Sequence, residues 1–183
     1  MKSTATYEAA PSVVRAYIGL GSNLNDPVSQ IHSAIAALRL LPGSQLASVS
    51  RLYQSAPMGP QDQPDYINAA VCLDTHLGAD RLLLALQVIE HQQGRVRDNT
   101  RWQARTLDLD LLLYGEEEIA CPSLTVPHSG ISQRLFVLQP LWDLNPDLVV
   151  PGQGALATLL ANLACDSMAV RPISDNDAPC FSH

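Results

Sequence analysis

The chain has 183 residues, a formal net charge of -7 at pH 7, 46% hydrophobic residues and 16% charged residues. This length suits one domain with a sizeable core, and this composition excludes a disordered or fibrous protein. Nucleic acid attracts basic surfaces, so the negative charge argues against a general nucleic-acid binder. No apolar run approaches the roughly 20 residues that span a bilayer, and the N-terminus lacks the apolar segment of a signal peptide. We therefore expect a cytoplasmic, monomeric protein that acts on small molecules, with no nucleic-acid or membrane partner.

The first half of the chain alternates apolar segments with turns that contain glycine and proline. Asp26 and Pro27 suit the N-cap and the first position of a helix, because the carboxylate can accept a free helical N–H and proline has none to leave unpaired. Three prolines within residues 55–65 predict an exposed loop. The elements predicted in this half are a strand over 13–20, a helix over 26–41, and strands over 46–54 and 66–75.

The clearest helix of the sequence follows over residues 78–93. Its leucines and isoleucine recur at helical spacing, and Gly94 is placed to end it, because glycine readily adopts the left-handed conformation of a helix C-terminus. Gln87 and Glu90 fall off the buried stripe that we predict for this helix.

The remaining elements are a strand around Asp108 and two short helices. The Asp108 strand ends near residues 114–115, and a helix over 129–138 is predicted to stop at Pro140, because proline breaks the helical hydrogen-bond pattern. Another helix is predicted over 154–163.

The order of the main elements is β-α-β-β-α-β, which predicts a ferredoxin-like α+β fold: an antiparallel sheet with both helices on one face and extra C-terminal helices. The Asp108 strand is expected at the centre of this sheet, which would explain its leucines. We expect a flexible N-terminal extension over residues 1–12, a single domain over 13–164 and a loosely held tail over 165–183.

Asp108 and Asp110 lie two residues apart in an otherwise apolar strand. Side chains alternate between the faces of a strand, so both carboxylates point to one face, while Leu107, Leu109 and Leu111 point to the other. Two like charges on a half-buried face require cations nearby. Two alternatives remain open: a magnesium site, since magnesium is usually held by one or two carboxylates plus substrate phosphates, and a structural ion pair with Arg105.

Four arginines fall in one short window next to these acids: Arg95, Arg97, Arg101 and Arg105. The guanidinium group matches phosphate oxygens in a bidentate manner, so local arginine in an acidic protein favours a phosphate-bearing ligand. In phosphoryl transfer, arginines neutralise the charge that spreads over the phosphate oxygens. The alternative is a solvated loop face.

The segment Gly19-Leu20-Gly21-Ser22-Asn23-Leu24 follows a predicted strand but lacks the third glycine of a dinucleotide-binding motif. There is no GxxxxGK[ST] loop either. We interpret the glycine pair as a tight turn after the strand.

Aromatic and amide side chains near the two predicted loops could bind a flat heterocycle by stacking and by hydrogen bonds to its edge. The candidates are Tyr66, Asn68, Trp102 and Phe136. Each could equally belong to the core. His128 could donate to phosphate or be an ordinary surface histidine.

Several ordered segments together resemble the 6-hydroxymethyl-7,8-dihydropterin pyrophosphokinases of folate biosynthesis, from about Ala16 to Pro151. Arg105-Thr106-Leu107-Asp108-Leu109-Asp110 is the most diagnostic. The other segments that carry the resemblance are YIGLGSNL at 17–24, GPQDQPDYINA at 59–69, GRVR at 94–97, Arg101-Trp102 and VPH at 126–128.

The resemblance implies a ferredoxin-like fold and transfer of the β,γ-pyrophosphoryl group of ATP to the pterin hydroxymethyl oxygen, with release of AMP. By the same resemblance, Asp108 and Asp110 would hold two Mg²⁺ ions that bridge the triphosphate. Arg95 and Arg97 would belong to a catalytic lid loop, and Arg105 would contact phosphate.

The resemblance also assigns residues to the two substrates. The nucleotide would be contacted by Gln87, Glu90, Arg105, Leu111, Thr125, His128 and Arg134. The pterin would be bound by main-chain groups of Ser55, Ala56 and Met58, by Tyr66 and Asn68, and between Trp102 and Phe136.

The match is not uniform. Asp98, Ser129 and Gly130 stand where some members carry basic, bulkier or charged side chains. Two other hypotheses stay open: a catalytically silent relative that binds pterin or nucleotide, motivated by these positions, and a ferredoxin-like RNA-binding or regulatory module, against which the net charge argues.

Overall fold

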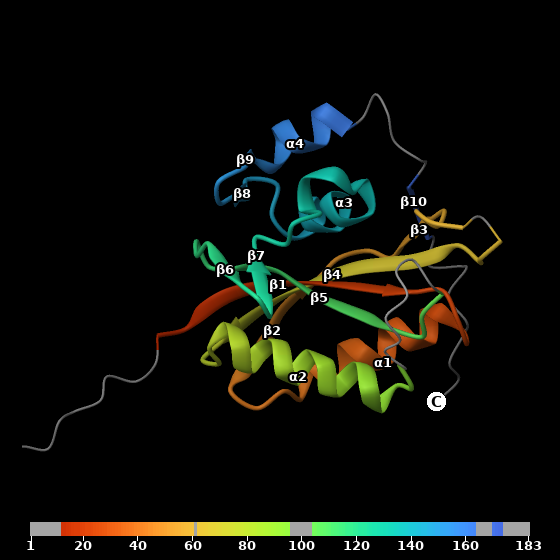
Figure 1. The fold of residues 1–183 in the computed structure, drawn as a ribbon, viewed down its shortest axis with the longest axis horizontal. Helices are drawn as coiled ribbons and strands as arrows, with labels where there is room; N and C mark the ends of the chain where they lie inside the picture. Colours follow the sequence, from red (N-terminus) through yellow and green to blue (C-terminus); the bar gives the residue numbers. More distant parts are fainter. Residues whose placement is uncertain (1–11, 61, 96–103, 164–169, 174–183) are drawn as a thin grey trace, which may run out of the picture.

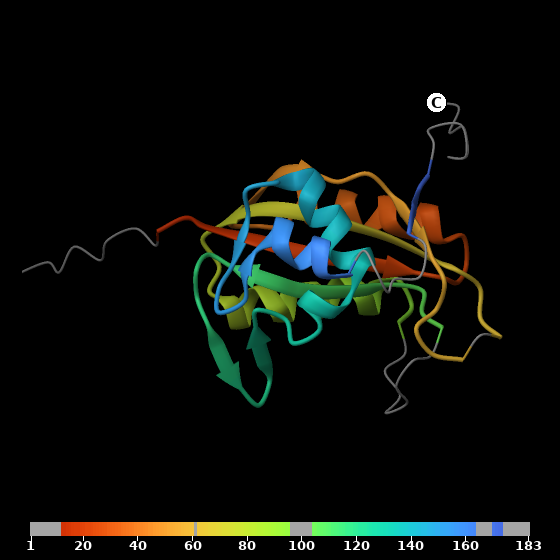
Figure 2. The same cartoon turned by 90° about the horizontal axis from the view of Figure 1, so that it is seen from above.

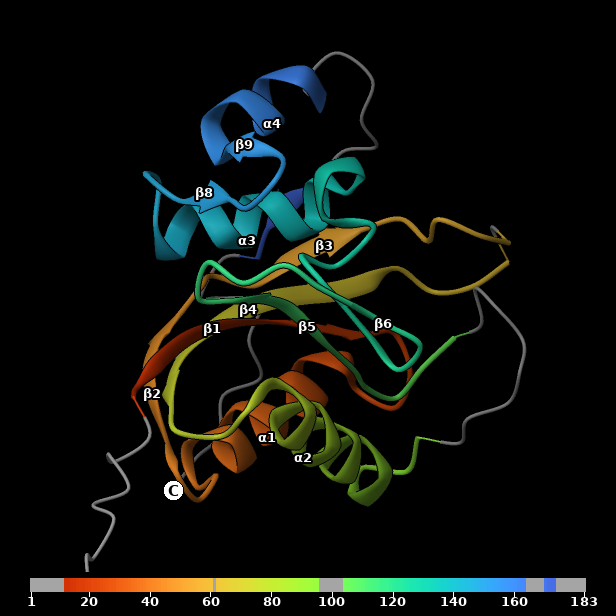
Figure 3. The same ribbon diagram turned by 60° about the vertical axis from the view of Figure 1, so that its left-hand side comes forward.

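The computed structural model describes residues 12–60, 62–95, 104–163 and 170–173. A main antiparallel sheet is covered on one face by α1 and α2 and on the other by α3, and α4 packs on α3 (Figures 1 and 3). The strands of this sheet are β1 (Val14–Ser22), β2 (Ser44–Val49), β3 (Tyr53–Ser55), β4 (Tyr66–Thr75), β5 (Asp108–Tyr114) and β10 (Arg171–Pro172). The helices are α1 (Pro27–Arg39), α2 (Ala79–Gln92), α3 (Leu135–Leu144) and α4 (Leu156–Leu163).

The strand order is β10-β3-β4-β1-β5, and β2 also pairs with β4. With β2 and β3, which both pair with β4, counted as one interrupted strand, the order of strands and helices up to β5 is the predicted β-α-β-β-α-β pattern, and the ferredoxin-like α+β class is confirmed. The other short elements are η1 (Ile131–Gln133), the hairpin of β6 (Ile119–Cys121) and β7 (Leu124–Val126), and the pair of β8 (Val149–Val150) and β9 (Gly154–Ala155). The hairpin projects to the side of the sheet next to β5 (Figure 2).

The predicted helix ends are confirmed. The Asp26 side chain accepts a hydrogen bond from the Ser29 N–H at 3.4 Å, directly before α1. Gly94 follows α2 with a φ of +81°, and its N–H donates to the His91 carbonyl at 3.0 Å. Because glycine has no Cβ, it takes this left-handed conformation without steric cost. Within the described residues, none of the helices combines the length and apolar character that membrane crossing requires.

The prediction of one strand over 46–54 is wrong, because the chain leaves the sheet between β2 and β3. The Ser50 hydroxyl accepts a hydrogen bond from the Ala70 N–H at 2.9 Å, and the Ser50 N–H donates to the Ala70 carbonyl at 2.9 Å. A side-chain oxygen thus replaces a backbone oxygen in the ladder. Both short strands still pair with β4.

The prediction that β5 lies at the sheet centre is also wrong. Among the described strands of this sheet β5 pairs with β1 alone, so it forms an edge. Its leucines are explained by cover on both faces: Leu109 and Leu111 pack in the core beneath α1 and α2, and Leu112 and Leu113 pack against the C-terminal helices. The His128 N–H donates to the Leu112 carbonyl at 3.0 Å and covers part of this edge.

The predicted stop at Pro140 is wrong as well. The helix begins later than predicted, at Leu135, and continues through Pro140 to Leu144. Leu138 and Leu141, on either side of the proline, are fully buried. Packing of this apolar face against the sheet therefore outweighs the helical hydrogen bond that proline cannot donate.

Asp143 ties α3 to the sheet. It accepts hydrogen bonds from Arg51 N–H, Nε and Nη2 at 3.1, 3.0 and 2.7 Å, and from the Tyr53 hydroxyl at 2.9 Å. Burial opposes ionisation of Asp143, but the bonds from Arg51 and Tyr53 outweigh it and hold its pKa below the ordinary value. The carboxylate thus holds a helix of one layer on a strand of another.

We predict that Asp143→Asn lowers the free energy of unfolding by about 2 kcal/mol at pH 7, because charge-assisted bonds are lost. Since the folded pKa is depressed, this contribution is complete above the ordinary carboxyl pKa and fades as the pH falls below about 4. Urea unfolding of both proteins at pH 7 and at pH 3 measures it.

The matched control is Asp74→Asn, which breaks an exposed pair with Arg15. Asp74→Asn should lower the free energy of unfolding by less than about 1 kcal/mol. A difference between wild type and Asp143→Asn that did not shrink at acid pH would contradict the assignment.

Candidate active site

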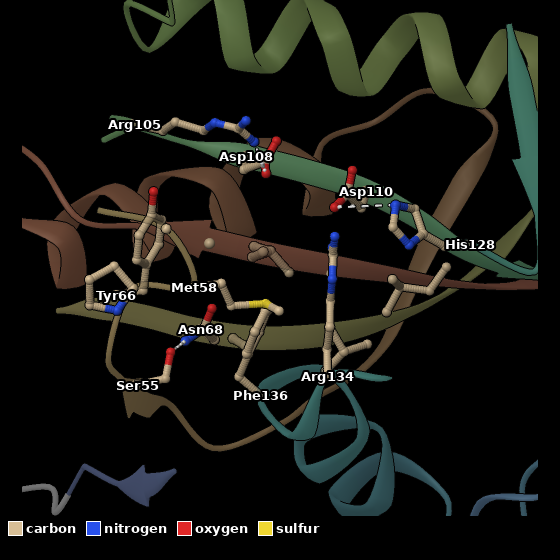
Figure 4. A pocket seen from close by; sticks show the side chains of 18 of the residues that line it. Ser55, Met58, Tyr66, Asn68, Arg105, Asp108, Asp110, His128, Arg134 and Phe136 are labelled. Atoms are coloured by element: carbon tan, nitrogen blue, oxygen red, sulfur yellow. Dashed lines mark hydrogen bonds and ion pairs between the residues drawn. The ribbon is translucent and has the colours of Figure 1, made fainter. Parts of the chain in front are cut away.

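A cavity of about 380 Å³ opens on the face of the sheet that α3 covers (Figure 4). β1 contributes its floor, β4 and β5 its flanks, and the segment from His128 to α3 its upper wall. The side chains that line it at the β3–β4 end include Ser55, Ala56, Pro57, Met58, Gly59, Gln63, Tyr66, Asn68 and Ala69. At the β5 and α3 end they include Arg105, Asp108, Asp110, Leu112, His128, Ser129, Arg134, Phe136 and Val137.

The glycine pair of the sequence forms the floor. Gly19, Leu20 and Gly21 also line the cavity and lie inside β1, so the interpretation as a turn after the strand is wrong. Gly21 pairs with Asn68 of β4 on one side and with Asp108 of β5 on the other. In the same way Gly19 pairs with Asp110. The floor between the amide and the two acids is therefore bare backbone.

The two acids share one strand face, as predicted. Asp108 and Asp110 line the cavity, while Leu107, Leu109 and Leu111 belong to the core on the opposite face. Both acids thus point into one space. The alternation expected for a half-buried strand is confirmed.

Asp108 is held by two guanidinium groups. Its Oδ1 contacts Arg95 Nη1, and its Oδ2 lies 2.5 Å from Arg105 Nη1. Burial opposes ionisation of Asp108, but the positive charges of Arg95 and Arg105 outweigh it and hold its pKa below the ordinary value. The ion pair with Arg105, one of the two alternatives from the sequence, is therefore present in this structure.

Asp110 is in a different electrostatic environment. Among the described residues, His128 Nε2 lies 3.9 Å from Asp110 Oδ2, and Arg134 extends toward it from the start of α3 (Figure 4). Burial and the negative charge of Asp108 raise the pKa of Asp110, against the opposing charges of His128 and Arg134. A cation placed between the two acids would relieve this repulsion.

The donor set fits magnesium held together with phosphate. In the described part of the chain, no group of three or more His, Cys, Asp and Glu side chains is placed to hold a metal. Of the residues that the structure describes, Asp108 and Asp110 are therefore the pair that would supply carboxylates to the metal. Magnesium commonly completes such a set with substrate phosphates and water.

The prediction that Glu90 falls off the buried stripe of α2 is wrong. Glu90 is only 1% exposed. It lies four residues after Leu86, which places both on the same helical face. Its Oε1 accepts a hydrogen bond from the Leu109 N–H at 2.8 Å and contacts Arg95 Nη1. Glu90 therefore joins α2 to β5 and holds Arg95 beside Asp108.

The Arg134 guanidinium occupies space beside the backbone of Gly130. A Cβ atom built on Gly130 would lie 2.7 Å from Arg134 Nε, which is closer than a real contact allows. The absence of a side chain at Gly130 thus gives the Arg134 guanidinium the space beside the backbone. This departure from the pattern of the resemblance has a packing role.

The structure brings most of the predicted site residues together. All pterin candidates within the described residues line the cavity, although Ser55 belongs to β3 and is buried, not part of an exposed loop. Arg97 and Trp102 lie outside the described residues. The predicted nucleotide residues that do not line the cavity are Gln87, Glu90, Leu111 and Thr125.

Sequence reasoning assigned no site role to several lining residues. Gly59 and Gln63 lie in a segment that carries the resemblance, which was a usable signal. Leu112 could not be found in this way, because it lies where the β1–β5 register shifts and strand alternation fails there. Val137 reaches the cavity because of the way α3 is placed on the sheet, which is a tertiary contact that the sequence pattern does not show.

The family model for 7,8-dihydro-6-hydroxymethylpterin-pyrophosphokinase (HPPK) matches residues 17–146. The chain belongs to this family. A 2-amino-4-hydroxy-6-hydroxymethyldihydropteridine pyrophosphokinase of Haemophilus influenzae is 47% identical over 156 residues, covering 85% of this chain and 97% of that protein. The protein of the same name from Pseudomonas aeruginosa is 52% identical over 149 residues, covering 81% and 91%. The family that the sequence segments resemble is confirmed.

Solved HPPK structures share the fold at low sequence identity. The wild-type HPPK-DHPS of Plasmodium falciparum with SDX-DHP superposes with a TM-score of 0.64 at 12% identity. The match covers 84% of this chain and 45% of that chain, so this chain spans less than half of the Plasmodium protein. At this identity the comparison supports the HPPK fold alone.

We predict that Glu90→Ala lowers the free energy of unfolding by about 3 kcal/mol, because it leaves Leu109 N–H and Arg95 without their buried acceptor. Glu90→Gln keeps an oxygen that can accept from the Leu109 N–H, so it should lower the free energy of unfolding less than Glu90→Ala does. Urea unfolding gives the stabilities, and amide hydrogen exchange reports Leu109 directly. Equal protection of the Leu109 amide in wild type and Glu90→Ala would refute the link.

Proposed function

We propose that this cavity is where the chain, a hydroxymethyldihydropterin pyrophosphokinase by family, transfers the β,γ-pyrophosphoryl group of ATP to the pterin and releases AMP. One observation carries the proposal. A pair of carboxylates with arginines, suited to a metal-bound triphosphate, lies in the same cavity as an amide and aromatic side chains suited to a flat heterocycle. The two substrates of the reaction therefore have complementary ends of one site.

The heterocycle belongs at the β3–β4 end. Tyr66 and Phe136 offer aromatic surface, Asn68 offers an amide to the ring edge, and the backbone from Ser55 to Met58 offers further polar groups. We retain the stacking of Trp102 opposite Phe136 as a proposal from the family resemblance.

The triphosphate belongs at the β5 end. Asp108 and Asp110 would hold two magnesium ions, and bound magnesium would supply positive charge to the phosphate oxygens. Arg105, His128 and Arg134 line the same end and would donate to phosphate. We retain Gln87, Leu111 and Thr125 as proposed nucleotide contacts, although they lie outside the cavity.

In the reaction, the pterin hydroxymethyl oxygen forms a bond to the β-phosphorus, and the bond from that phosphorus to the oxygen shared with the α-phosphate breaks. The hydroxyl proton passes from the attacking oxygen to solvent water, and the electrons of the broken bond leave with the AMP oxygen. The chain's arginines would stabilise the charge on the transferring group, which is the main protein contribution to such transfers. Aligning the two substrates supplies the rest.

Arg95 would change partners during this cycle. In the present structure it lies between Glu90 and Asp108. A metal at Asp108 would compete with this guanidinium, and Arg95 would then be free to contact phosphate. This supports the proposed lid role of Arg95, which it would share with Arg97.

We predict that Asp108→Asn and Asp110→Asn each reduce AMP formation from ATP and 6-hydroxymethyl-7,8-dihydropterin by at least about 100-fold, as expected when a group that stabilises charge is lost. Asp74→Asn, on the far end of β4, is the control and should keep normal turnover. Chromatographic separation of AMP from ADP measures the reaction.

Formation of ADP and a pterin monophosphate would contradict pyrophosphoryl transfer. Tight binding of both substrates without AMP would indicate a catalytically silent relative. Near wild-type rates in either folded Asn variant would contradict the assignment of the acids.

A further inference from the structure

At Gly21, the floor of the cavity lies between Asn68, which would bind the heterocycle, and Asp108, which would bind the metal-bound triphosphate. Gly21 of β1 is directly opposite Asn68 of β4 and directly opposite Asp108 of β5. Figure 4 shows the amide and the carboxylate on the two strands that flank β1. Because neighbouring strands lie roughly 4.8 Å apart, the Asn68 and Asp108 positions are separated by about 10 Å. A bicyclic ring with a short arm spans such a distance.

The orientation of Asn68 directs its oxygen toward this floor. Its Nδ2 group donates to Ser55 Oγ at 2.9 Å and is 3.4 Å from the Tyr53 carbonyl oxygen, both on β3. The amide nitrogen is thus used inside the protein, and the amide is 5% exposed. The oxygen points away from β3 and is the group that Asn68 can offer to a ligand N–H.

A side chain at Gly21 would stand between these groups. A Cβ atom there would lie 3.6 Å from Asn68 Oδ1, 3.9 Å from Asp108 Cβ and 4.0 Å from Tyr66 Cδ1. These are ordinary van der Waals distances, so the protein itself accommodates a methyl group without strain. The methyl group would nevertheless cover the amide oxygen and fill the floor between the two ends of the cavity.

We propose that Gly21 is a specificity-determining residue: its bare backbone is the passage along which the arm of a flat heterocycle runs from Asn68 to the acids. This inference rests on the proposed function and adds how the site selects the length and thickness of its acceptor substrate. Gly19 does not have this position, because a Cβ atom on it would meet the side chain of Leu112, at 3.3 Å, and not the amide.

The test measures the binding of each substrate separately. The affinity of α,β-methylene ATP is measured first with Mg²⁺, since this analogue cannot break at the bond that the reaction cleaves. The affinity of 6-hydroxymethylpterin is then titrated in the presence of the saturating analogue. Both are measured for wild type, Gly21→Ala and Gly21→Val by isothermal titration calorimetry, together with thermal unfolding.

The control is Gly78→Ala, which adds the same methyl group at a position with no heavy atom within 4 Å and outside the cavity. We expect Gly21→Ala to weaken pterin binding at least about tenfold, as overpacking of a fitted site does. Gly21→Val should weaken it further, and the affinity for the ATP analogue should stay within about threefold in Gly21→Ala. Gly78→Ala should bind both ligands as wild type does.

Unchanged pterin affinity in Gly21→Ala overturns the inference while the proposed function stands. An equal loss of ATP-analogue affinity, or a large drop in the unfolding temperature of Gly21→Ala, also overturns it, because the effect would then not be local to the passage. A wild-type protein that binds the ATP analogue but no pterin overturns the proposed function instead.

Discussion

Two carboxylates two residues apart on one face of a half-buried strand require positive charge around them, and the site is built to meet this requirement. Arg95 and Arg105 neutralise Asp108, whereas among the described residues His128 Nε2 lies 3.9 Å from Asp110 and Arg134 extends toward it. The pKa directions of the two acids differ for this reason. In the described part of the chain Asp108 is therefore more fully neutralised than Asp110, and a metal ion bound with phosphate, as we propose, would supply further positive charge.

Residues outside the cavity hold the arginines beside the acids in position. Glu90 is buried and holds both the Leu109 N–H and the Arg95 guanidinium, so the position of the arginine beside Asp108 depends on a residue of α2 beneath the sheet. On the other side, Gly130 leaves the space that Arg134 fills. The cavity is thus positioned by both layers of helices, and the strand register places Gly21 between its two ends.

Local patterns predicted much of this structure. The alternation of Asp108 with leucines predicted two acids on one face, and Asp26 and Gly94 marked helix ends correctly. These features depend on neighbours in sequence. The family resemblance, carried by several ordered segments, predicted most of the residues that line the cavity.

Features that depend on tertiary packing were not predictable in the same way. Pro140 inside α3 is tolerated because both neighbouring leucines are buried against the sheet. Glu90 was predicted to fall off the buried stripe of its helix, although the Leu109 N–H and a partly buried arginine partner hold it in the interior. The glycine pair resembled a turn, because a strand rarely includes two glycines unless something must approach its backbone closely. Both partners of Gly21 lie on strands far away in sequence.

We propose that Asp108 and Asp110 together hold two divalent ions with the triphosphate. Electron paramagnetic resonance of Mn²⁺, titrated into the protein with saturating α,β-methylene ATP, counts the bound ions. We expect two Mn²⁺ ions per chain in wild type and fewer in Asp110→Asn. The same number of bound ions in wild type and in Asp110→Asn would contradict it.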